Sequence, residues 1–591
     1  MEKTQVIVGL GSCGIAAGAK KTYDTIQNIM QIDNLDFELK KTSCVGMCFR
    51  EPLVEVIDDT GYFLYGGIDE AKALEIIERH VQHHEPVKEY IVKSDLFQTK
   101  DDSYFAGQVK IALRNCGFID PEKIEDAEEK GAYKALQKIA NEGVTREAVI
   151  QTVLDSGIRG RGGGGFPTGM KWKFAYNSPG DEKYIICNAD EGDPGAFMDR
   201  SILEGDPHSV LEAMAICGYT MGSDEGIIYI RAEYPLAIER LHVAIKQARE
   251  YGLLGKDILG TGFDFDITLR YGAGAFVCGE ETALIHSMEG HRGEPTVKPP
   301  FPAESGYNGK PTNVNNVETF ANIPAIILKG AEWFSSIGTE KSKGTKVFAL
   351  AGKINNVGLI EVPMGTTLRE VIFEIGGGIK DGKKFKAVQT GGPSGGCLTE
   401  KHLDTPIDFD NLIAAGSMMG SGGMIVMDED DCMVAMAKFY LEFTVEESCG
   451  KCAPCRIGNK RLHETLHKIT EGKGTMHDLE LLKNMSNVIK DTSLCGLGQT
   501  SPNPVLSMLD NFYNEFLAHV SDHKCEAGQC KSLLKYNIIE EECVGCTACA
   551  RVCPVGCISG EKKEVHIIDQ SICIKCGACM DKCKFNAIEL I

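Results

Sequence analysis

The cysteines constrain this chain more than any other feature of its sequence. Of its 24 cysteines, twelve fall into three quartets, all of them after residue 440. Spacings of two or three residues within these groups are typical of metal ligands and not of a disulfide framework. A chain of 591 residues is too long for one hydrophobic core, so we expect about three to five domains around these groups.

The two C-terminal quartets form an internal repeat with a period of about thirty residues. Three thiolates on a tight loop can hold three corners of an iron–sulfur cubane. In the two-cluster bacterial ferredoxin pattern, the fourth cysteine of each run serves the other cluster. This pattern predicts one [4Fe–4S] cluster on Cys543, Cys546, Cys549 and Cys583, and another on Cys573, Cys576, Cys579 and Cys553. The alternative interpretation is a pair of structural zinc sites.

The third quartet lies further upstream. It combines Cys449, Cys452 and Cys455, in a Glu-Ser-Cys-Gly-Lys-Cys-Ala-Pro-Cys segment, with Cys495 as the fourth predicted ligand. We interpret it as another [4Fe–4S] site. For this quartet alone, a zinc site is a credible alternative.

Composition and charge exclude several classes of partner. A net charge of −22 opposes binding to nucleic acid or to an anionic membrane, because phosphate groups demand basic patches. The N-terminus has no apolar signal segment, and the longest uncharged run, residues 411–427, is interrupted by glycine and serine and is short for a bilayer. Because thiolates persist in a reducing compartment, we expect a cytoplasmic protein.

Hydrophobic periodicity divides the chain into segments of different character. Short apolar runs that alternate with helical patterns predict α/β domains, whereas the segment before Cys495 reads as helical. The fold class is therefore a multi-domain α/β protein. The expected domains are residues 1–90 (small α/β), 110–335 (larger α/β), 340–425 (compact and β-rich), 430–515 (helical), 516–535 (a zinc or hinge segment) and 536–591 (the double cysteine repeat).

A glycine-rich loop opens the larger α/β segment at residues 157–169. Glycines without a Cβ let backbone N–H groups approach a phosphate, and Arg159 and Arg161 add positive charge. The spacing does not match the dinucleotide fingerprint Gly-x-Gly-x-x-Gly followed by an acidic residue. Taken alone, the loop is equally consistent with an ordinary flexible connection.

Three further segments identify a resemblance. They are Asn188–Gly195 (NADEGDPG), Tyr271–Ala283 (YGAGAFVCGEETA) and Asn313–Thr319 (NVNNVET). Together with the glycine-rich loop and the Glu-Ser-Cys-Gly motif, they resemble the NADH/FMN-binding (51 kDa) subunit of respiratory complex I over residues 110–515. The residues 345–425 resemble the ubiquitin-like (β-grasp) domain of that family.

The resemblance implies a set of cofactor-binding residues. The FMN would be lined by Gly160, Arg161, Gly162, Gly163, Gly164, Gly165, Asn188, Asp190, Glu191, Gly279, Glu280, Asn315 and Asn316. NADH would be held by Phe166, Phe174, Glu281, Lys298 and Phe301, with Lys171 as a further cofactor-binding candidate. Two positions depart from the family, since it usually has Glu at Asp193 and Tyr at Phe276. We expect Glu280 and Glu281 to repel a 2′-phosphate and so to favour NAD over NADP.

The whole architecture resembles one branch of this family most closely. The complex I subunit normally lacks both terminal domains, whereas the NADH/FMN (beta) subunits of electron-bifurcating, NAD-dependent [FeFe]-hydrogenases have them. The resemblance implies a hetero-oligomer with a catalytic [FeFe]-hydrogenase subunit, a small thioredoxin-like [2Fe–2S] subunit and ferredoxin as partners. In it a flavin converts the two electrons of a hydride into single-electron steps. Alternatives are the beta subunit of an NAD-dependent formate dehydrogenase, or an electron-relay scaffold whose nucleotide site has decayed.

The N-terminal segment resembles a thioredoxin-like [2Fe–2S] ferredoxin. Cys13, Cys44 and Cys48 match three ligand positions of that family, but Val8 stands at the first. Two interpretations remain open, namely a [2Fe–2S] cluster with a substitute ligand and a scaffold that has lost its cluster.

A histidine and two cysteines precede the double repeat. His519, Cys525 and Cys530 suit zinc, with His566 or Cys557 as the fourth ligand. The alternative is a surface histidine near two free thiols. The isolated cysteines are expected to be buried small apolar residues, and they are Cys116, Cys187, Cys217, Cys397 and Cys432.

Overall fold

The computed structural model describes residues 3–590, which fall into two compact units. The first unit runs to Asp428 and also includes Glu447–Lys451 and Leu494–Thr500. The second contains Glu429–Glu446, Cys452–Ser493 and the residues from Ser501 onward. None of the helices within residues 3–590 combines the length and apolarity that a bilayer crossing requires.

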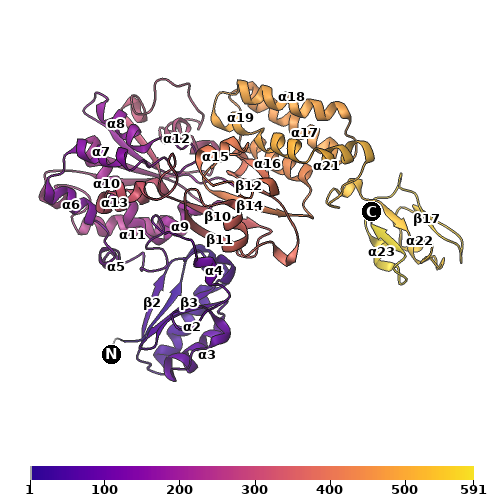
Figure 1. The fold of residues 1–591 in the computed structure, drawn as a ribbon, viewed down its shortest axis with the longest axis horizontal. Helices are drawn as coiled ribbons and strands as arrows, with labels where there is room; N and C mark the ends of the chain where they lie inside the picture. Colours follow the sequence, from indigo (N-terminus) through magenta and orange to yellow (C-terminus); the bar gives the residue numbers. More distant parts are fainter. Residues whose placement is uncertain (1–2, 591) are drawn as a thin grey trace. The chain divides into compact units, whose positions relative to one another are not determined.

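The first unit begins with a five-stranded sheet in the order β2-β1-β3-β4-β5. Figure 1 shows this part of the chain in indigo, with β2 and β3 labelled. Its parallel pair β1 and β2 is joined through α2, and an antiparallel hairpin of β3 and β4 follows, which is the thioredoxin-like arrangement that the sequence predicts. Val8 is fully buried in the core of this sheet. The bounds are β1 Gln5–Gly9, α2 Ala19–Ile32, β2 Glu38–Thr42, β3 Leu53–Asp58, β4 Gly61–Gly66, α3 Glu70–Ile76 and β5 Ile91–Ser94.

The last strand lies beyond the predicted domain boundary at residue 90. β5 pairs with β4 in an antiparallel ladder, so the sheet extends past that boundary. Its four residues, IVKS, are too few and too mixed to show a period of two. Only pairing with a neighbouring strand defines it.

A four-stranded parallel sheet in the order β8-β7-β6-β9 organises the next part of the first unit. β6 is central, and the chain continues to β7 on one side of it and reaches β9 on the other. The carboxyl ends of β6 and β9 therefore meet at a topological switch point, where open α/β sheets bind their ligands. The bounds are β6 Tyr184–Ala189, β7 Glu225–Arg231, β8 Asp266–Gly272 and β9 Thr312–Asn316.

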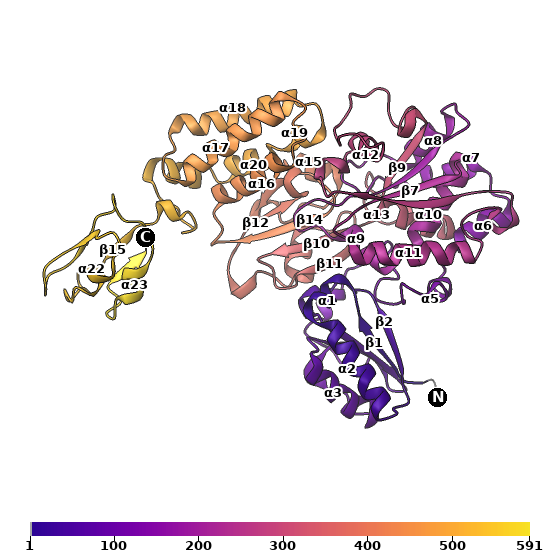
Figure 2. The same cartoon turned by 180° about the vertical axis from the view of Figure 1, so that it is seen from behind.

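Helices cover both faces of this sheet (Figure 2). On one face Ile185 and Cys187 of β6 join the core formed with α10 (Pro207–Met221) and α13 (Val317–Lys329). On the other face Ile186 packs in a separate cluster with α12 (Glu281–Met288). Alternate residues of one strand thus enter two cores, which explains why its sequence is apolar throughout.

A second mixed sheet in the first unit has the order β11-β10-β14-β12-β13. β10 and β14 are parallel at its centre, and the other neighbours are antiparallel, which is the β-grasp arrangement predicted for residues 345–425. The bounds are β10 Thr345–Gly352, β11 Gly358–Pro363, β12 Phe385–Thr390, β13 Gly396–Thr399 and β14 Gly423–Asp428.

The second unit is helical up to its terminal repeat. The main helices are α16 Met433–Glu447, α17 Asn459–Thr470, α18 Met476–Thr492 and α20 Asn503–Asn511. In the repeat, β15 (Tyr536–Ile538) pairs with β18 (Ile588–Leu590), and β16 (Ile558–Ser559) pairs with β17 (Ile567–Ile568). Each half carries one short helix after its first cysteines, α22 (Ala548–Val552) or α23 (Ala578–Lys582).

Candidate functional site

A cavity of about 480 Å³ lies at the carboxyl ends of β6 and β9 in the first unit. Its size is within the range of small-molecule and cofactor sites. Of the residues predicted to bind cofactors, the ones that line it are Gly160, Gly162, Gly163, Gly164, Gly165, Phe166, Lys171, Asn188, Asp190, Glu191, Gly279, Glu280, Glu281, Asn315 and Asn316. Segments more than 150 residues apart in the sequence are thereby brought to one wall.

The glycine-rich loop forms a tight reversal at the cavity. The Gly160 N–H donates to Phe166 O (2.8 Å), and the Thr168 N–H donates to Ile158 O (3.0 Å). Gly163 has φ +112°, and a Cβ there would lie 3.1 Å from the Gly420 backbone. At Gly165, with φ +62°, a Cβ would lie 2.7 Å from the Phe409 ring. Glycine is needed at both positions because a side chain would displace the loop.

The two arginines of this loop hold its backbone instead of facing the cavity. The guanidinium of Arg161 is buried and donates to Arg159 O (2.9 Å) and Lys343 O (2.7 Å). Arg159 donates to Gly165 O (2.6 Å) and stacks over the Phe409 ring. We expected their charges to be available to a phosphate, but in the structure both guanidinium groups donate hydrogen bonds to backbone carbonyls. Backbone carbonyls cannot be located from sequence, so this role was not predictable.

Asp190 is the polar side chain in the cavity wall that most clearly lacks a partner. It is 9% exposed, and neither carboxylate oxygen accepts a hydrogen bond from the described residues. Burial raises the pKa of Asp190 to about 7, although the Arg231 charge opposes the rise. Its neighbour Asn188 is fixed, since its amide donates to Gly279 O (2.9 Å) and its oxygen accepts from the Asp190 N–H (3.1 Å). An oriented, unpaired and buried carboxylate indicates a place for a hydrogen-bond donor of a ligand.

Glu191 and Asn316 are lining residues whose side chains are engaged by the protein. The Glu191 carboxylate accepts from the N–H groups of Asp199 (3.1 Å) and Arg200 (3.2 Å) at the start of α9, Met198–Gly205. Asn316 caps α13 by accepting from the Glu318 N–H (2.9 Å), while its amide donates to Asp199. These contacts tie two helix N-termini to the cavity wall and keep it rigid.

Glu280 and Glu281 are paired with lysines. Glu281 bonds to Lys171 (2.7 Å) and Lys298 (2.7 Å), and Glu280 bonds to Lys298 (2.9 Å) and caps α12 through Thr282. Burial would raise the pKa of Glu281, but the two lysine charges outweigh it and lower that pKa to about 2. Two carboxylates with two ammonium groups carry no net charge. The expected repulsion of a 2′-phosphate therefore does not follow from these glutamates alone.

The predicted aromatic contacts differ in position. Phe166 lines the cavity, whereas Phe174, Phe301 and Lys298 do not. Phe166, Phe174 and Phe301 are about half exposed, at 51%, 47% and 52% respectively. Their ring faces are therefore open for stacking.

The β-grasp insert contributes lining residues that sequence reasoning missed, namely Gly391, Ser394, Met418, Gly420 and Ser421. Ser421 also donates to Asp193, a position where this chain departs from its family. The glycine-rich runs GGPSGG and GSMMGSGG were a signal that could have found them.

The terminal repeat forms two small hollows in the second unit. One is lined by Cys543, Cys546, Cys549 and Cys583, and the other by Cys553, Cys573, Cys576 and Cys579. Each hollow takes its fourth cysteine from the other half of the repeat, in the crossed arrangement that the ferredoxin pattern predicts. Cys557 lies at the second hollow, with its sulfur 3.3 Å from that of Cys553.

The cysteines of the third quartet belong to different units. Cys449 and Cys495 are part of the first unit, and Cys495 directly precedes α19 (Gly496–Thr500), which supplies lining residues to the cavity. Cys452 and Cys455 are part of the second unit, in which the Cys455 sulfur accepts from the Asn459 amide at 3.5 Å.

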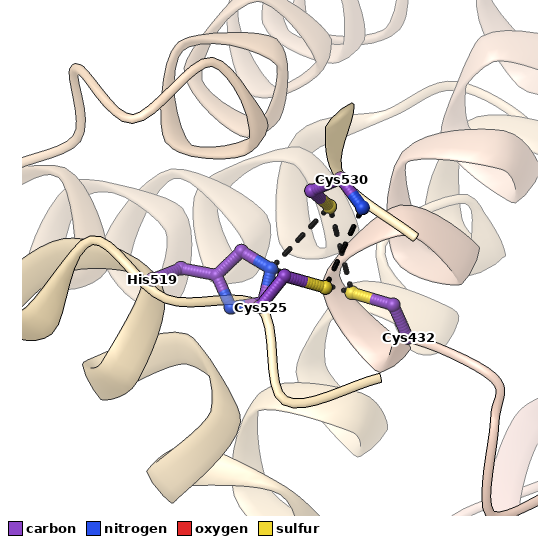
Figure 3. A group of neighbouring side chains, drawn as sticks. All are labelled: Cys432, His519, Cys525 and Cys530. Carbon is purple, nitrogen blue, oxygen red and sulfur yellow. Dashed lines mark hydrogen bonds between the residues drawn. The ribbon is translucent and has the colours of Figure 1, made fainter. Parts of the chain in front are cut away.

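A group of four buried metal-ligating residues lies in the second unit (Figure 3). Cys432, His519, Cys525 and Cys530 place their donor atoms within 4.8 Å of one another. The Cys432 and Cys530 sulfurs are 3.7 Å apart, and His519 Nε2 lies 3.4 Å from each of them. Tetrahedral zinc with Zn–S bonds of about 2.3 Å would separate two sulfurs by roughly 3.8 Å. His519 Nδ1 donates to Glu515 O (2.7 Å), which leaves Nε2 free to ligate.

The fourth member of this group corrects the prediction. Cys432, which we expected to be an isolated apolar residue, completes the set in place of His566 or Cys557. His566 is buried in the first hollow of the repeat, where its Nδ1 lies 3.1 Å from Glu564 O. Cys432 precedes α16 and reaches His519 across 87 residues, a separation that no local spacing rule detects.

The three N-terminal cysteines also converge. The Cys48 thiol lies within hydrogen-bond reach of Cys13 and of Cys44. Cys44 Sγ accepts from the Gly46 N–H (3.2 Å), and the Arg200 guanidinium lies 3.8 Å from Cys13 Sγ. The Cys48 hydrogen bond, helped by the Arg200 charge, lowers the pKa of Cys13 to about 7 despite burial.

Comparison with known families agrees with this geometry. Residues 153–325 match the Nuo51 FMN-binding domain, and residues 435–519 match the NADH-ubiquinone oxidoreductase-F iron-sulfur binding region. Residues 536–559 and 566–589 match the 4Fe-4S binding domain, and residues 347–398 match the SLBB domain. The predicted FMN-binding domain and multiple [4Fe–4S] clusters are thus confirmed.

Two relatives that match over almost their full length decide the family. The HndC subunit of the NADP-reducing hydrogenase of Solidesulfovibrio fructosivorans is 67% identical over 81% of this chain and 98% of that protein. An NADH-quinone oxidoreductase subunit of Rhizobium meliloti is 45% identical over 70% of this chain and 98% of that protein. The chain belongs to the family of the complex I 51 kDa subunit.

This chain is also similar to a solved structure. A chain of an NAD⁺-reducing [NiFe]-hydrogenase in its H2-reduced state has 30% identity and a TM-score of 0.62, covering 88% of this chain and 85% of that one. As a member of the family, this chain is a flavin and iron–sulfur oxidoreductase subunit, as predicted.

The cavity residues fit an FMN. The glycines of the loop present backbone without side chains, as a phosphate cradle requires. Asp190 offers an unpaired acceptor for a ring N–H. Glu191 and Asn316 in the same wall already bond to the protein itself.

Proposed function

We propose that this chain is the NAD(H)-oxidising subunit of an electron-bifurcating, NAD-linked [FeFe]-hydrogenase. Its partners would be a catalytic hydrogenase subunit, a small thioredoxin-like [2Fe–2S] subunit and ferredoxin. The observation that carries the proposal is the cavity at the β6/β9 switch point, which has an intact glycine loop and the unpaired Asp190. A scaffold with a decayed nucleotide site would have no reason to keep a buried carboxylate without a partner.

The residues have distinct roles in this proposal. The glycine loop and Asp190 hold and orient the flavin, while Glu191 and Asn316 keep the wall in place. Phe166, Phe174 and Phe301 offer faces for the nicotinamide dinucleotide, next to Lys171 and Lys298. A bound flavin supplies the conversion between a two-electron hydride donor and one-electron acceptors. Cys495, directly before the cavity-lining helix α19, is a ligand of the [4Fe–4S] cluster that accepts electrons from the flavin.

The proposed metal content is three [4Fe–4S] clusters, one N-terminal [2Fe–2S] cluster and one zinc ion. The eight cysteines of the terminal repeat hold two of the [4Fe–4S] clusters, and the quartet of Cys449, Cys452, Cys455 and Cys495 holds the third. The zinc ligands are Cys432, His519, Cys525 and Cys530, which support a closed structural site because all four positions are filled by protein.

Purification of the native complex tests the hydrogenase assignment. We expect an [FeFe]-hydrogenase subunit to co-purify, and NADH to reduce an artificial dye with one FMN bound per chain. Electron bifurcation predicts that hydrogen evolution from NADH requires reduced ferredoxin in the same assay. Co-purification with a formate dehydrogenase catalytic subunit would favour the alternative. Evolution of hydrogen from NADH alone would refute bifurcation and leave the flavin site unaffected.

A further inference from the structure

The N-terminal sheet offers three thiols for a cluster that needs four ligands. The expected fourth position, Val8, is fully buried in the apolar core and has no ligating atom. A substitute must come from another residue that reaches the same loops. The structure brings Glu51, three residues after Cys48, to this place.

Glu51 points a buried carboxylate at the thiols. Its Oε2 accepts from the Leu53 N–H (3.1 Å), whereas its Oε1 is shielded from solvent and makes no hydrogen bond of normal geometry with the described residues. The Cys44 thiol lies within hydrogen-bond reach of the Glu51 carboxylate. The buried Oε1, beside a cysteine thiol and without a donor of normal hydrogen-bond geometry among the described residues, is available to a metal ion.

A glycine makes room for this carboxylate beside Cys13. A Cβ at Gly14 would lie 2.9 Å from Glu51 Oε2 and 2.7 Å from Gly9 O. At Gly11, a Cβ would lie 3.1 Å from Cys44 Cβ. The two loops and the carboxylate therefore pack as closely as glycine allows.

The other carboxylate near Cys13 is already engaged. Glu204 accepts from the Ser12 N–H (2.9 Å) and from the Ser12 hydroxyl (2.5 Å), and it pairs with Arg200 (3.7 Å). It anchors the N-terminal domain to α9 and has no oxygen left for a metal. Glu51 has one.

We propose that Glu51 is the fourth ligand of a [2Fe–2S] cluster bound by Cys13, Cys44 and Cys48. This inference rests on the N-terminal cluster of the proposed function and names its ligand set. Three thiolates and one carboxylate carry the same four negative charges as four thiolates, and [2Fe–2S] clusters accept non-cysteine ligands, as in Rieske centres. When a preassembled cluster is transferred from a donor, three Fe–S bonds and one Fe–O bond form as four bonds to the donor's ligands break, and the protons of the thiols and the carboxyl pass to the released ligands or to solvent. No electron is exchanged in this step.

The ligand loop is also held against the flavin-binding part of the first unit. Lys110 donates to Val45 O (2.9 Å), and the Tyr104 hydroxyl lies 2.7 Å from Gly46 O. Arg200 contacts Cys13 Sγ with its side chain, and its backbone N–H donates to Glu191, a lining residue of the cavity. One residue thus connects the ligand set with the flavin cavity wall.

The test uses the full-length, anaerobically purified chain. Iron is counted, and the dithionite-reduced protein is measured by electron paramagnetic resonance at a temperature where [4Fe–4S] signals are too broad to observe. We expect the unmodified protein to show a [2Fe–2S] signal and Glu51→Ala to lose it, together with the two irons of one cluster. Glu51→Cys should retain those irons and show altered g values. Glu55→Gln, at a buried glutamate of β3, is the matched control and should leave the spectrum unchanged.

Two outcomes would overturn the proposal. One is an unmodified protein with full [4Fe–4S] content but no [2Fe–2S] signal. The other is a wild-type spectrum in Glu51→Ala, since another group would then be the ligand. The Glu51→Cys variant separates loss of a ligand from misfolding, because a misfolded loop would not recover the cluster. FMN content and NADH-dependent dye reduction in the same samples report the proposed function independently, so the two failures are distinguishable.

Discussion

Asp190→Asn should change flavin affinity and the stability of the flavin-free protein in opposite directions. In the flavin-free protein, burial raises the pKa of Asp190 from 3.8 to about 7. The folded state therefore binds the proton more tightly than the unfolded state, and stability falls as the pH rises from about 4 to about 7. A rise of this size corresponds to roughly 4 kcal/mol at most above pH 7. Because asparagine is neutral, Asp190→Asn removes this cost.

The bound flavin should reverse the sign. A hydrogen bond from a ligand donor to a carboxylate is worth about 1.5–3 kcal/mol. Asparagine keeps an acceptor oxygen but not the charge, so the hydrogen bond falls to about 0.5–1.5 kcal/mol and FMN binding should weaken by roughly tenfold at pH 8. At a pH well below the Asp190 pKa the Asp190 carboxyl is protonated, so both proteins present a neutral side chain and the difference in FMN affinity should shrink.

The assay compares both proteins with and without flavin. Thermal unfolding of the flavin-free forms should show Asp190→Asn to be more stable at pH 8 and similar to the unmodified protein near pH 4.5. Flavin titration by fluorescence gives the dissociation constants at the same pH values. Glu191→Ala is the control, because Glu191 lines the same cavity but accepts two hydrogen bonds from α9, and the loss of those bonds should destabilise the flavin-free protein. If Asp190→Asn destabilises the flavin-free protein and leaves FMN affinity unchanged, the carboxylate is structural and our reasoning is wrong.

Four further predictions concern the metals and the nucleotide. Cys432→Ser should lose about one zinc per chain by elemental analysis while its iron is retained, whereas the control Cys187→Ser in β6 should keep both metals. Retention of zinc in Cys432→Ser would contradict the four-residue site. Cys583→Ser should reduce the cluster content at the hollow with Cys543, and Cys557→Ser should leave the iron count unchanged; the opposite result would exchange the ligand roles. Glu281→Gln should weaken NADH binding and raise the use of NADPH relative to NADH by about tenfold, because Lys171 and Lys298 become available to a 2′-phosphate. An unmodified enzyme that already prefers NADPH would overturn the choice of NAD(H). Truncation after Leu534 keeps the zinc ligands and should preserve NADH-dependent dye reduction while abolishing exchange with ferredoxin; surviving exchange would place the exit for electrons elsewhere.

Local patterns were sufficient for much of the architecture. The cysteine repeat, the glycine loop and the alternation of strands and helices each depend on residues close together in sequence, where spacing translates directly into geometry. They predicted the α/β, β-rich and helical parts and the double ferredoxin repeat, and the family resemblance added the thioredoxin-like and β-grasp assignments. The crossed pairing of the eight repeat cysteines also followed, because both halves of the repeat obey one short motif.

Contacts between distant segments were not predictable. Cys432 reads as an isolated thiol until folding brings it to His519, and Glu51 belongs to no motif in the sequence until folding brings it to the N-terminal cysteines. Arg161 reads as a phosphate ligand, but backbone carbonyls that only the fold brings near it hold its guanidinium. In each case the residue type was known, and what decided its role was which groups compete for its polar atoms.

The sequence by itself determined which chemistries this chain can support, because thiolates, glycines and carboxylates occur at spacings that suit clusters and a phosphate. Tertiary structure alone decided which of these groups remain free to use that chemistry. Glu280 and Glu281 form ion pairs with lysines, and Glu191 accepts hydrogen bonds from the N-terminus of α9. Asp190 is buried without a hydrogen-bond partner among the described residues. The physical reason is that a buried polar atom must be satisfied, and only the packing of remote segments determines whether the protein itself supplies its partner.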